Sequence, residues 1–144
     1  MKKKVAIIGA GIAGLTLASL LNTNSDFEFV IYEKEENLNL DEGFGIQLAV
    51  NGTSILNQIG FDKLDKSEKY HPSKLDFYST NCNKVCDLDL IPFNSANVKY
   101  TTLKRSILIK FLKGFRIYID EKKNSYYRIR NRRAYLSKSF KDKS

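Results

Sequence analysis

The stretch "VAIIGAGIAGLTLASLL", residues 5–21, carries a G-x-G-x-x-G pattern between two apolar runs. The run before the glycines, residues 5–8, is typical of a strand buried on both faces of a parallel sheet. From residue 13 to residue 21 the apolar side chains recur at helical spacing, and the polar residues 22–25 end the pattern. The sequence therefore predicts a strand, a glycine turn and a helix in direct succession.

A second strand is predicted at residues 27–32, which are apolar and aromatic apart from Glu28. Strand, helix and strand form a βαβ unit, and the right-handed crossover rule makes the two strands parallel neighbours. The charges begin at Glu33, which stands 19 positions after Gly14. An acidic residue about 20 positions beyond the glycines is the partner that a dinucleotide-binding fold requires.

The glycine pattern has a physical reason at each position. Gly9 permits the tight turn, Gly11 has no side chain to block a pyrophosphate, and Gly14 lets the helix pack closely on the strand. The helix N-terminus offers N–H groups to the phosphates, and Glu33 offers a carboxylate to the ribose hydroxyls. That carboxylate disfavours the 2′-phosphate of NADP, which leaves FAD and NAD as candidates. The predicted phosphate-binding positions are Gly9, Ala10, Gly11, Ile12, Ala13 and Gly14.

A secretory signal is the competing interpretation of the first residues, because three lysines precede the apolar run. Two features disfavour it. Residues 17–19 lack an A-x-A cleavage site, and the following strand needs the first strand as its neighbour. We therefore expect a cytoplasmic protein without a membrane span.

Composition adds limits on size and partners. The chain has 144 residues, 42% of them hydrophobic, which suits one α/β domain. Its net charge of +8 arises at the C-terminal end, because residues 104–144 carry 14 Lys and Arg against 3 Asp and Glu. Cys82 and Cys86 match neither a metal site nor a disulfide framework, so we expect reduced thiols.

Further along the chain, Asn51 is the expected N-cap of a helix that runs to about Ile59 and stops at Gly60. Residues 74–90 alternate and turn as a β-hairpin. A helix fits residues 105–113, with Gly114 as its cap. Beyond it we predict a basic tail, residues 115–144, with at most one strand followed by irregular chain. His71, the only histidine, is expected at the surface.

Several stretches together resemble the FAD-dependent monooxygenases that include aromatic-ring and ubiquinone-pathway hydroxylases. In order along the chain they are "VAIIGAGIAGLTLASLL", "VIYEKE", "GFGIQLAVNGTSILNQIG" and "LKRSILIKFL", with the hairpin "LDFYSTNCNKVCDLDL" before the last. The resemblance covers residues 4 to about 113, and the third stretch is the most specific to the family. It implies a Rossmann-like FAD-binding domain with an inserted β-hairpin, over residues 1–114.

The resemblance also implies roles for individual residues. Gly9, Gly11 and Gly14 would surround the FAD pyrophosphate, and Glu33 would bind the adenosine ribose. It adds Lys34 beside the adenine half, Gly45 and Ile46 in a loop near the flavin, and Arg105 close to the cofactor. Arg105 also suits this role chemically, because a guanidinium gives charge-assisted hydrogen bonds to phosphate. No residue is predicted as a catalytic acid or base.

In such enzymes NAD(P)H is the reductant, and O2 is used to hydroxylate an electron-rich small molecule. The family continues beyond this length with a later flavin-binding motif and a substrate domain. We therefore expect an N-terminal piece, ended early or read out of frame near residue 114, that is catalytically incomplete by itself. Two alternatives stay open: an NAD-binding dehydrogenase domain, and a nucleic-acid-binding module that acts through the Tyr- and Arg-rich tail.

Overall fold

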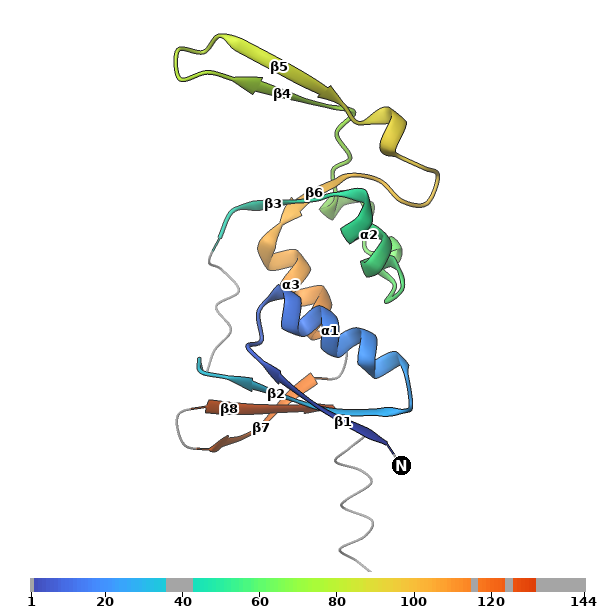
Figure 1. The fold of residues 1–144 in the computed structure, drawn as a ribbon, viewed down its shortest axis with the longest axis vertical. Coiled ribbons are helices and arrows are strands. Elements are labelled where there is room, and N and C mark those ends of the chain that lie inside the picture. The colour runs from blue at the N-terminus through green and yellow to red at the C-terminus, as the bar shows by residue number, and fades with distance from the viewer. Residues whose placement is uncertain (1, 36–42, 115–116, 124–125, 132–144) are drawn as a thin grey trace, which may run out of the picture. The chain divides into compact units, whose positions relative to one another are not determined.

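The computed structural model describes residues 2–35, 43–114, 117–123 and 126–131. The chain folds as two compact units (Figure 1). The first unit joins Met1–Glu42 to Ser106–Ser144, and the second is Gly43–Arg105. The boundary between the two units lies at Gly43, while the division into a domain at residues 1–114 and a tail stays a prediction.

The first unit contains the predicted βαβ unit within a mixed sheet of strand order β1-β2-β8-β7. β1 and β2 are parallel, with Lys3 opposite Phe27 and Ile8 opposite Tyr32, as the crossover rule predicts. β8 pairs antiparallel with both β2 and β7. The elements of this unit are β1 (Lys3–Ile8), α1 (Ile12–Thr23), β2 (Phe27–Glu33), β7 (Ile117–Lys123), β8 (Tyr126–Asn131) and α3 (Arg105–Lys113), whose first residue, Arg105, belongs to the second unit.

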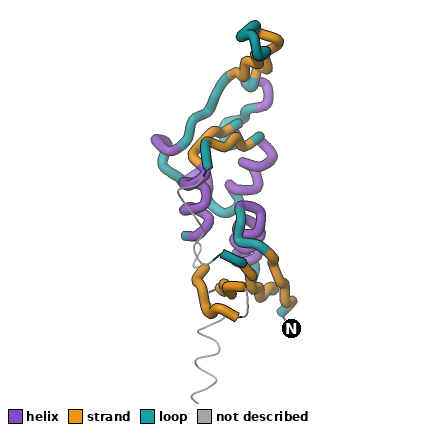
Figure 2. The backbone as a smooth tube through the Cα atoms, turned by 90° about the vertical axis from the view of Figure 1, so that its left-hand side faces the viewer, coloured by secondary structure: helices purple, strands orange, loops and turns teal. Residues whose placement is uncertain are grey.

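α1 covers one face of the β1–β2 pair, and the two views of Figures 1 and 2 agree on this. Leu15 and Ala18 of the helix are fully buried, and Phe29 and Ile31 are buried on the strand face that it covers. The expectation that β1 is buried on both faces is wrong, because Ile8 is 77% exposed. Successive side chains of a strand point to opposite faces, so Ile8 lies on the face away from α1.

The tail differs from its prediction of at most one strand. β7 and β8 form an antiparallel hairpin, and β8 extends the sheet beside β2, with Ile31 opposite Ile129. The interleaved Tyr and Arg of residues 126–131 suit a solvated basic run, but the same letters also alternate as a strand does. Residues 126–131 form a strand because antiparallel pairing with β2 supplies their main-chain hydrogen bonds. Residues 132–144 lie outside the described residues.

The second unit is built around α2 and two short antiparallel ladders. β3 pairs with β6, with Ile46 opposite Leu103, and Tyr70 bridges to Thr102. Its core contains Leu56, Phe61 and Leu103. The elements of this unit are β3 (Gly45–Leu48), α2 (Val50–Asn57), the 3-10 turns Phe61–Lys63, Lys66–Glu68 and Ile91–Phe93, β4 (Lys74–Tyr78), β5 (Lys84–Asp89) and β6 (Thr101–Lys104).

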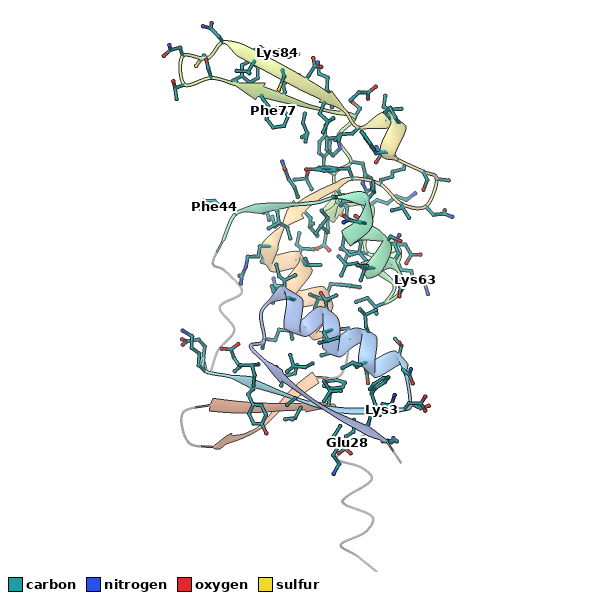
Figure 3. All side chains as sticks on the ribbon, in the orientation of Figure 1. Lys3, Glu28, Phe44, Lys63, Phe77 and Lys84 are labelled. Carbon is teal, nitrogen blue, oxygen red and sulfur yellow. The ribbon has the colours of Figure 1, made fainter. Side chains whose placement is uncertain are left out.

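The hairpin predicted at residues 74–90 is confirmed as β4 and β5, with Lys74 opposite Asp89. Its turn includes Cys82, at φ 60°, and Cys82 and Cys86 are both free thiols, as expected. One face of the ribbon carries an ion-pair cluster in which Lys84 Nζ lies 2.9 Å from Asp76 and 2.6 Å from Asp87. The hairpin projects beyond the β3–β6 ladder, and Figure 3 labels Phe77 and Lys84 on it.

The three expected helices are all present, with errors at both ends of α2. α2 begins at Val50 with Ala49 as its N-cap, so the assignment of Asn51 as the cap is wrong. The Asn51 side chain instead accepts a hydrogen bond from the N–H of Gly52, 2.8 Å away, inside the first turn. α2 ends at Asn57 with Gln58 as its C-cap, two residues before the end predicted near Ile59. Gly60, at φ +86°, is instead the N-cap of the 3-10 turn Phe61–Lys63. In the described part of the chain, no helix is long and apolar enough to cross a membrane.

Gly14 is the point at which α1 passes closest to the end of β1. A Cβ at this position would lie 2.0 Å from the carbonyl oxygen of Gly9 and 3.3 Å from Ile7 Cγ2. Real Cβ atoms do not approach backbone so closely, and the carbonyl belongs to the rigid turn. The helix therefore keeps this position only with glycine at residue 14.

We predict that Gly14→Ala destabilises the first unit by about 1–3 kcal/mol, because the methyl group forces α1 away from β1. Gly52→Ala is the control, since a Cβ there meets nothing within 4 Å and alanine is favoured over glycine inside a helix such as α2. Urea unfolding followed by circular dichroism measures both variants. Equal stabilities of the two variants would contradict the proposed contact.

Candidate functional site

The glycine turn joins the end of β1 to the start of α1. Gly9 adopts φ +93°, a left-handed conformation that favours glycine, and its N–H donates to the carbonyl of Tyr32, 2.7 Å away. Gly11 is the N-cap of α1, and its carbonyl accepts from Leu15 N at 2.9 Å. The turn is thus tied to β2 on one side and to the helix on the other.

Open space lies over the first two glycines. A Cβ built on Gly9 or on Gly11 meets no atom of the described residues within 4 Å, which is the clearance that a ligand backbone or phosphate needs. The first turn of α1 carries no acidic side chain, and no described side chain caps it. Its N–H groups have no acceptor within the helix, and the helix dipole places partial positive charge there. This end of α1 can accept an anion.

Glu33 closes the other side of the turn. Its Oε2 accepts from the N–H of Ala10 at 2.6 Å, and its Oε1 accepts from the N–H of Lys34 at 2.8 Å and of Glu35 at 3.1 Å. The residue is only 9% exposed, and Ala10 is fully buried. The carboxylate therefore connects the end of β2 to the glycine turn and lies next to the space above it.

These hydrogen bonds also fix the charge of Glu33. Burial of the carboxyl group raises its pKa, but the N–H groups of Ala10, Glu35 and Lys34 stabilise the ionised form and, with the Lys34 ammonium, lower the pKa overall. Lys34 itself is exposed, and its Nζ lies 3.7 Å from Glu35 Oε1. The site thus presents a fixed negative charge beside an electropositive helix end, which suits a ribose next to a phosphate.

The remaining predicted residues lie in the second unit. Gly45 and Ile46 belong to the strand β3, so their assignment to a loop is wrong, because both pair with β6. Arg105 begins α3, and its N–H donates to the carbonyl of Phe44 at 3.2 Å. The Arg105 side chain lies over Gly43, where its Cδ would be 2.8 Å from an added Cβ.

Two features of these regions are absent from the sequence-based prediction. The first is that Gly43, at φ +102°, has no side chain, and the Arg105 side chain occupies the space that a Cβ would fill. The G-x-G pattern of residues 43–45 could have predicted such a close approach. The hydrogen bond from Ala10 to Glu33 is the other, because spacing alone does not show which N–H a carboxylate accepts. Of the predicted positions, residues 9–14, Glu33 and Lys34 lie together at the glycine turn of the first unit.

Comparison with known proteins agrees with this geometry. Residues 7–40 match the model of the NAD(P)-binding Rossmann-like domain. The FAD-dependent monooxygenase anuJ of Penicillium roqueforti is 35% identical over 108 residues, which are 72% of this chain and 12% of that protein. The 3-amino-4-hydroxybenzoate 2-monooxygenase PtnB3 of Streptomyces platensis is 42% identical over 59 residues, 41% of this chain and 14% of the relative.

A solved structure shares the fold. A variant of 2-methyl-3-hydroxypyridine-5-carboxylic acid oxygenase superposes with a TM-score of 0.62 at 24% identity, over 79% of this chain and 29% of that protein. The chain thus spans less than a third of the length of these relatives. The match to the Rossmann-like model, residues 7–40, includes the glycine turn and Glu33. Over the part of their length that it spans, the chain is similar in sequence to FAD-dependent monooxygenases.

Proposed function

We propose that this chain is the FAD-binding portion of a flavin-dependent monooxygenase. The observation that carries the proposal is the open space over Gly9 and Gly11, bordered by the ionised carboxylate of Glu33 and the uncapped start of α1. A dinucleotide needs these three features together: clearance for the pyrophosphate, N–H donors for its charge and an acceptor for the ribose. The names of the relatives favour FAD as the dinucleotide.

Each part of the turn has its own task in this proposal. The N–H groups of residues 11–14 bind the pyrophosphate, and Gly11 excludes any side chain from its path. Glu33 accepts hydrogen bonds from the ribose hydroxyls while Ala10 holds the carboxylate in place. Gly45, Ile46 and Arg105 of the second unit also contribute to FAD binding, with the Arg105 guanidinium contacting phosphate.

When bound, FAD would supply the redox chemistry of an NAD(P)H- and O2-dependent hydroxylation of an aromatic or similar small molecule. The chain's own residues bind and orient the adenosine and pyrophosphate part. None of the proposed site residues is a proton donor or acceptor for a substrate, so the complete reaction calls for residues outside this site. We also propose that the complete monooxygenase acts on such a small molecule and is located in the cytoplasm.

An NAD-binding dehydrogenase domain is the second candidate, because the family model that matches residues 7–40 is described as NAD(P)-binding. A glycine turn with an acidic partner serves either dinucleotide. The two candidates separate in a direct titration, since NAD binding without FAD binding would favour the dehydrogenase.

FAD binding is tested on the purified full chain by quenching of flavin fluorescence on titration. We expect saturable binding that Gly11→Ala weakens by about tenfold or more, roughly 1.4 kcal/mol, because the methyl group occupies the path of the pyrophosphate. Gly52→Ala is the control, since glycine at that position of α2 is also open to a Cβ. A native chain that takes up no FAD would refute the cofactor assignment for these residues.

Arg105→Gln is expected to weaken FAD binding by about tenfold, through loss of a charge-assisted hydrogen bond. Lys104→Gln, a change of the neighbouring exposed cation at the end of β6, is the matched control and should leave the affinity within about twofold. Equal losses in both variants would point to general electrostatic attraction and remove Arg105 from the site.

Glu33→Gln should lower the stability of the first unit at neutral pH by roughly 1–3 kcal/mol, because an amide cannot accept all three N–H bonds and brings its own donor. The folded pKa of Glu33 lies below the ordinary value of 4.5, so its contribution is present above that pH and is lost as pH falls. Thermal unfolding from pH 7 to about pH 3 should show the native chain converging on the variant. A constant difference over this range would be inconsistent with an ionised Glu33.

A further inference from the structure

A pocket of about 730 Å³ lies within the second unit, between α2, the segment around the 3-10 turns, and the residues before β6. This volume is in the range of small-molecule sites. Figure 3 shows the side chains of this region beside α2. The residues that line it include none of the eleven positions proposed for FAD, so a ligand in this pocket is independent of the proposed function.

Two buried polar atoms on the pocket wall have no hydrogen-bond partner among the described residues. They are Thr53 Oγ1 and Asn57 Oδ1, which are one turn apart on α2. Thr53 is only 4% exposed. The Asn57 amide is oriented by a bond from its Nδ2 to the carbonyl of Asn97, 2.8 Å away, which leaves Oδ1 as an acceptor. Buried polar groups in folded proteins are nearly always paired with protein or with ordered water, and the described residues supply no partner for these two.

The charge on the pocket wall is positive. Among the described residues that line it, Lys66, Lys69 and Lys99 stand against a single acid, Asp62. Lys69 is held in place, because its Nζ donates to the carbonyls of Phe61 at 3.0 Å and of Asp62 at 3.1 Å. An ammonium has three donors, so these two bonds leave one for a ligand.

The surroundings of Lys69 favour an anion as the missing partner. Burial of its ammonium lowers the pKa of Lys69, and Lys66 acts in the same direction, while Asp62 and Asp65 oppose the change. A bound anion would relieve both the desolvation and the repulsion between the two lysines. Neutral ligands would leave this charge cluster uncompensated.

We propose that this pocket binds a small organic anion that carries both an oxyanion group, carboxylate or phosphate, and a hydroxyl group. Lys66, Lys69 and Lys99 contact the oxyanion. The hydroxyl group pairs with Thr53 and Asn57, because Asn57 Oδ1 needs a donor and the Thr53 hydroxyl group can donate or accept.

The binding test uses isothermal titration calorimetry on the full chain with three probes: glycerol 3-phosphate, malate and inorganic phosphate. We expect saturable binding of one of the first two, and tighter binding of that probe than of inorganic phosphate, which lacks the organic hydroxyl group. Glycerol 3-phosphate and malate separate the phosphate from the carboxylate source. Absence of saturable binding by both would overturn the proposal.

Charge variants test the place of binding. Lys66→Gln and Lys99→Gln should each weaken binding by about tenfold. Lys63→Gln is the matched control, because Lys63, labelled in Figure 3, is exposed in the same unit and is not among the residues that line the pocket. Equal weakening in all three variants, or displacement of the probe by FAD, would place the anion elsewhere and overturn the proposal.

Thr53→Val separates a ligand-binding role from a structural one. The change conserves volume and removes an unpaired buried hydroxyl group, so the free chain should unfold at the same temperature or higher. Binding of the hydroxylated probe should fall about fivefold to tenfold, while binding of inorganic phosphate stays unchanged. Unchanged binding of the hydroxylated probe would assign the Thr53 hydroxyl group to a trapped water and contradict its role in the proposed site. The lysine variants provide an independent answer if this variant fails to fold.

Discussion

The close approach of Gly14 to the carbonyl of Gly9 is the constraint on which the first unit depends. Because no side chain separates them, α1 begins immediately at the end of β1 and its N-terminus stays at the glycine turn. The same placement lets α1 bury Leu15 and Ala18 against the strand face that carries Phe29 and Ile31. Packing and anion binding therefore share one geometrical requirement, and a change at Gly14 affects both.

The hydrogen bond from the N–H of Ala10 to the Glu33 carboxylate connects the glycine turn to the second strand of the βαβ unit. It connects residues 23 positions apart and brings the end of β2 to the turn that follows β1. Parallel pairing of the two strands places both carboxyl ends at one edge of the sheet, where ligands bind in open α/β folds. A carboxylate in this position has a structural use even before any ligand arrives. Glu33 therefore holds the turn in place in addition to its proposed role as the ribose acceptor.

The predictable parts of the fold are those governed by local patterns. Apolar spacing at residues 13–21, 105–113 and 74–90 is enough for two helices and the hairpin, and the glycine turn follows from three letters. Features that depend on distant partners are not predictable in this way. β8 is a strand because β2 and β7 pair with it, and Ile8 is exposed because α1 covers only one face of β1. The capping error at Asn51 has a local cause, since its side chain bonds Gly52 inside the helix.

The candidate cofactor site can be predicted from the sequence, whereas the pocket beside α2 cannot. The glycine turn recognises an anion through backbone N–H groups and through the absence of side chains, so its signature is a short run of letters with fixed spacing. The pocket depends on Thr53 and Asn57 from one helix and on lysines from three separate positions between residues 66 and 99. No spacing rule connects them, and each residue alone suits an ordinary surface or helix position. Within the described part of the chain, the unpaired atoms Thr53 Oγ1 and Asn57 Oδ1 distinguish this wall from the rest of the surface, and they are visible only in three dimensions.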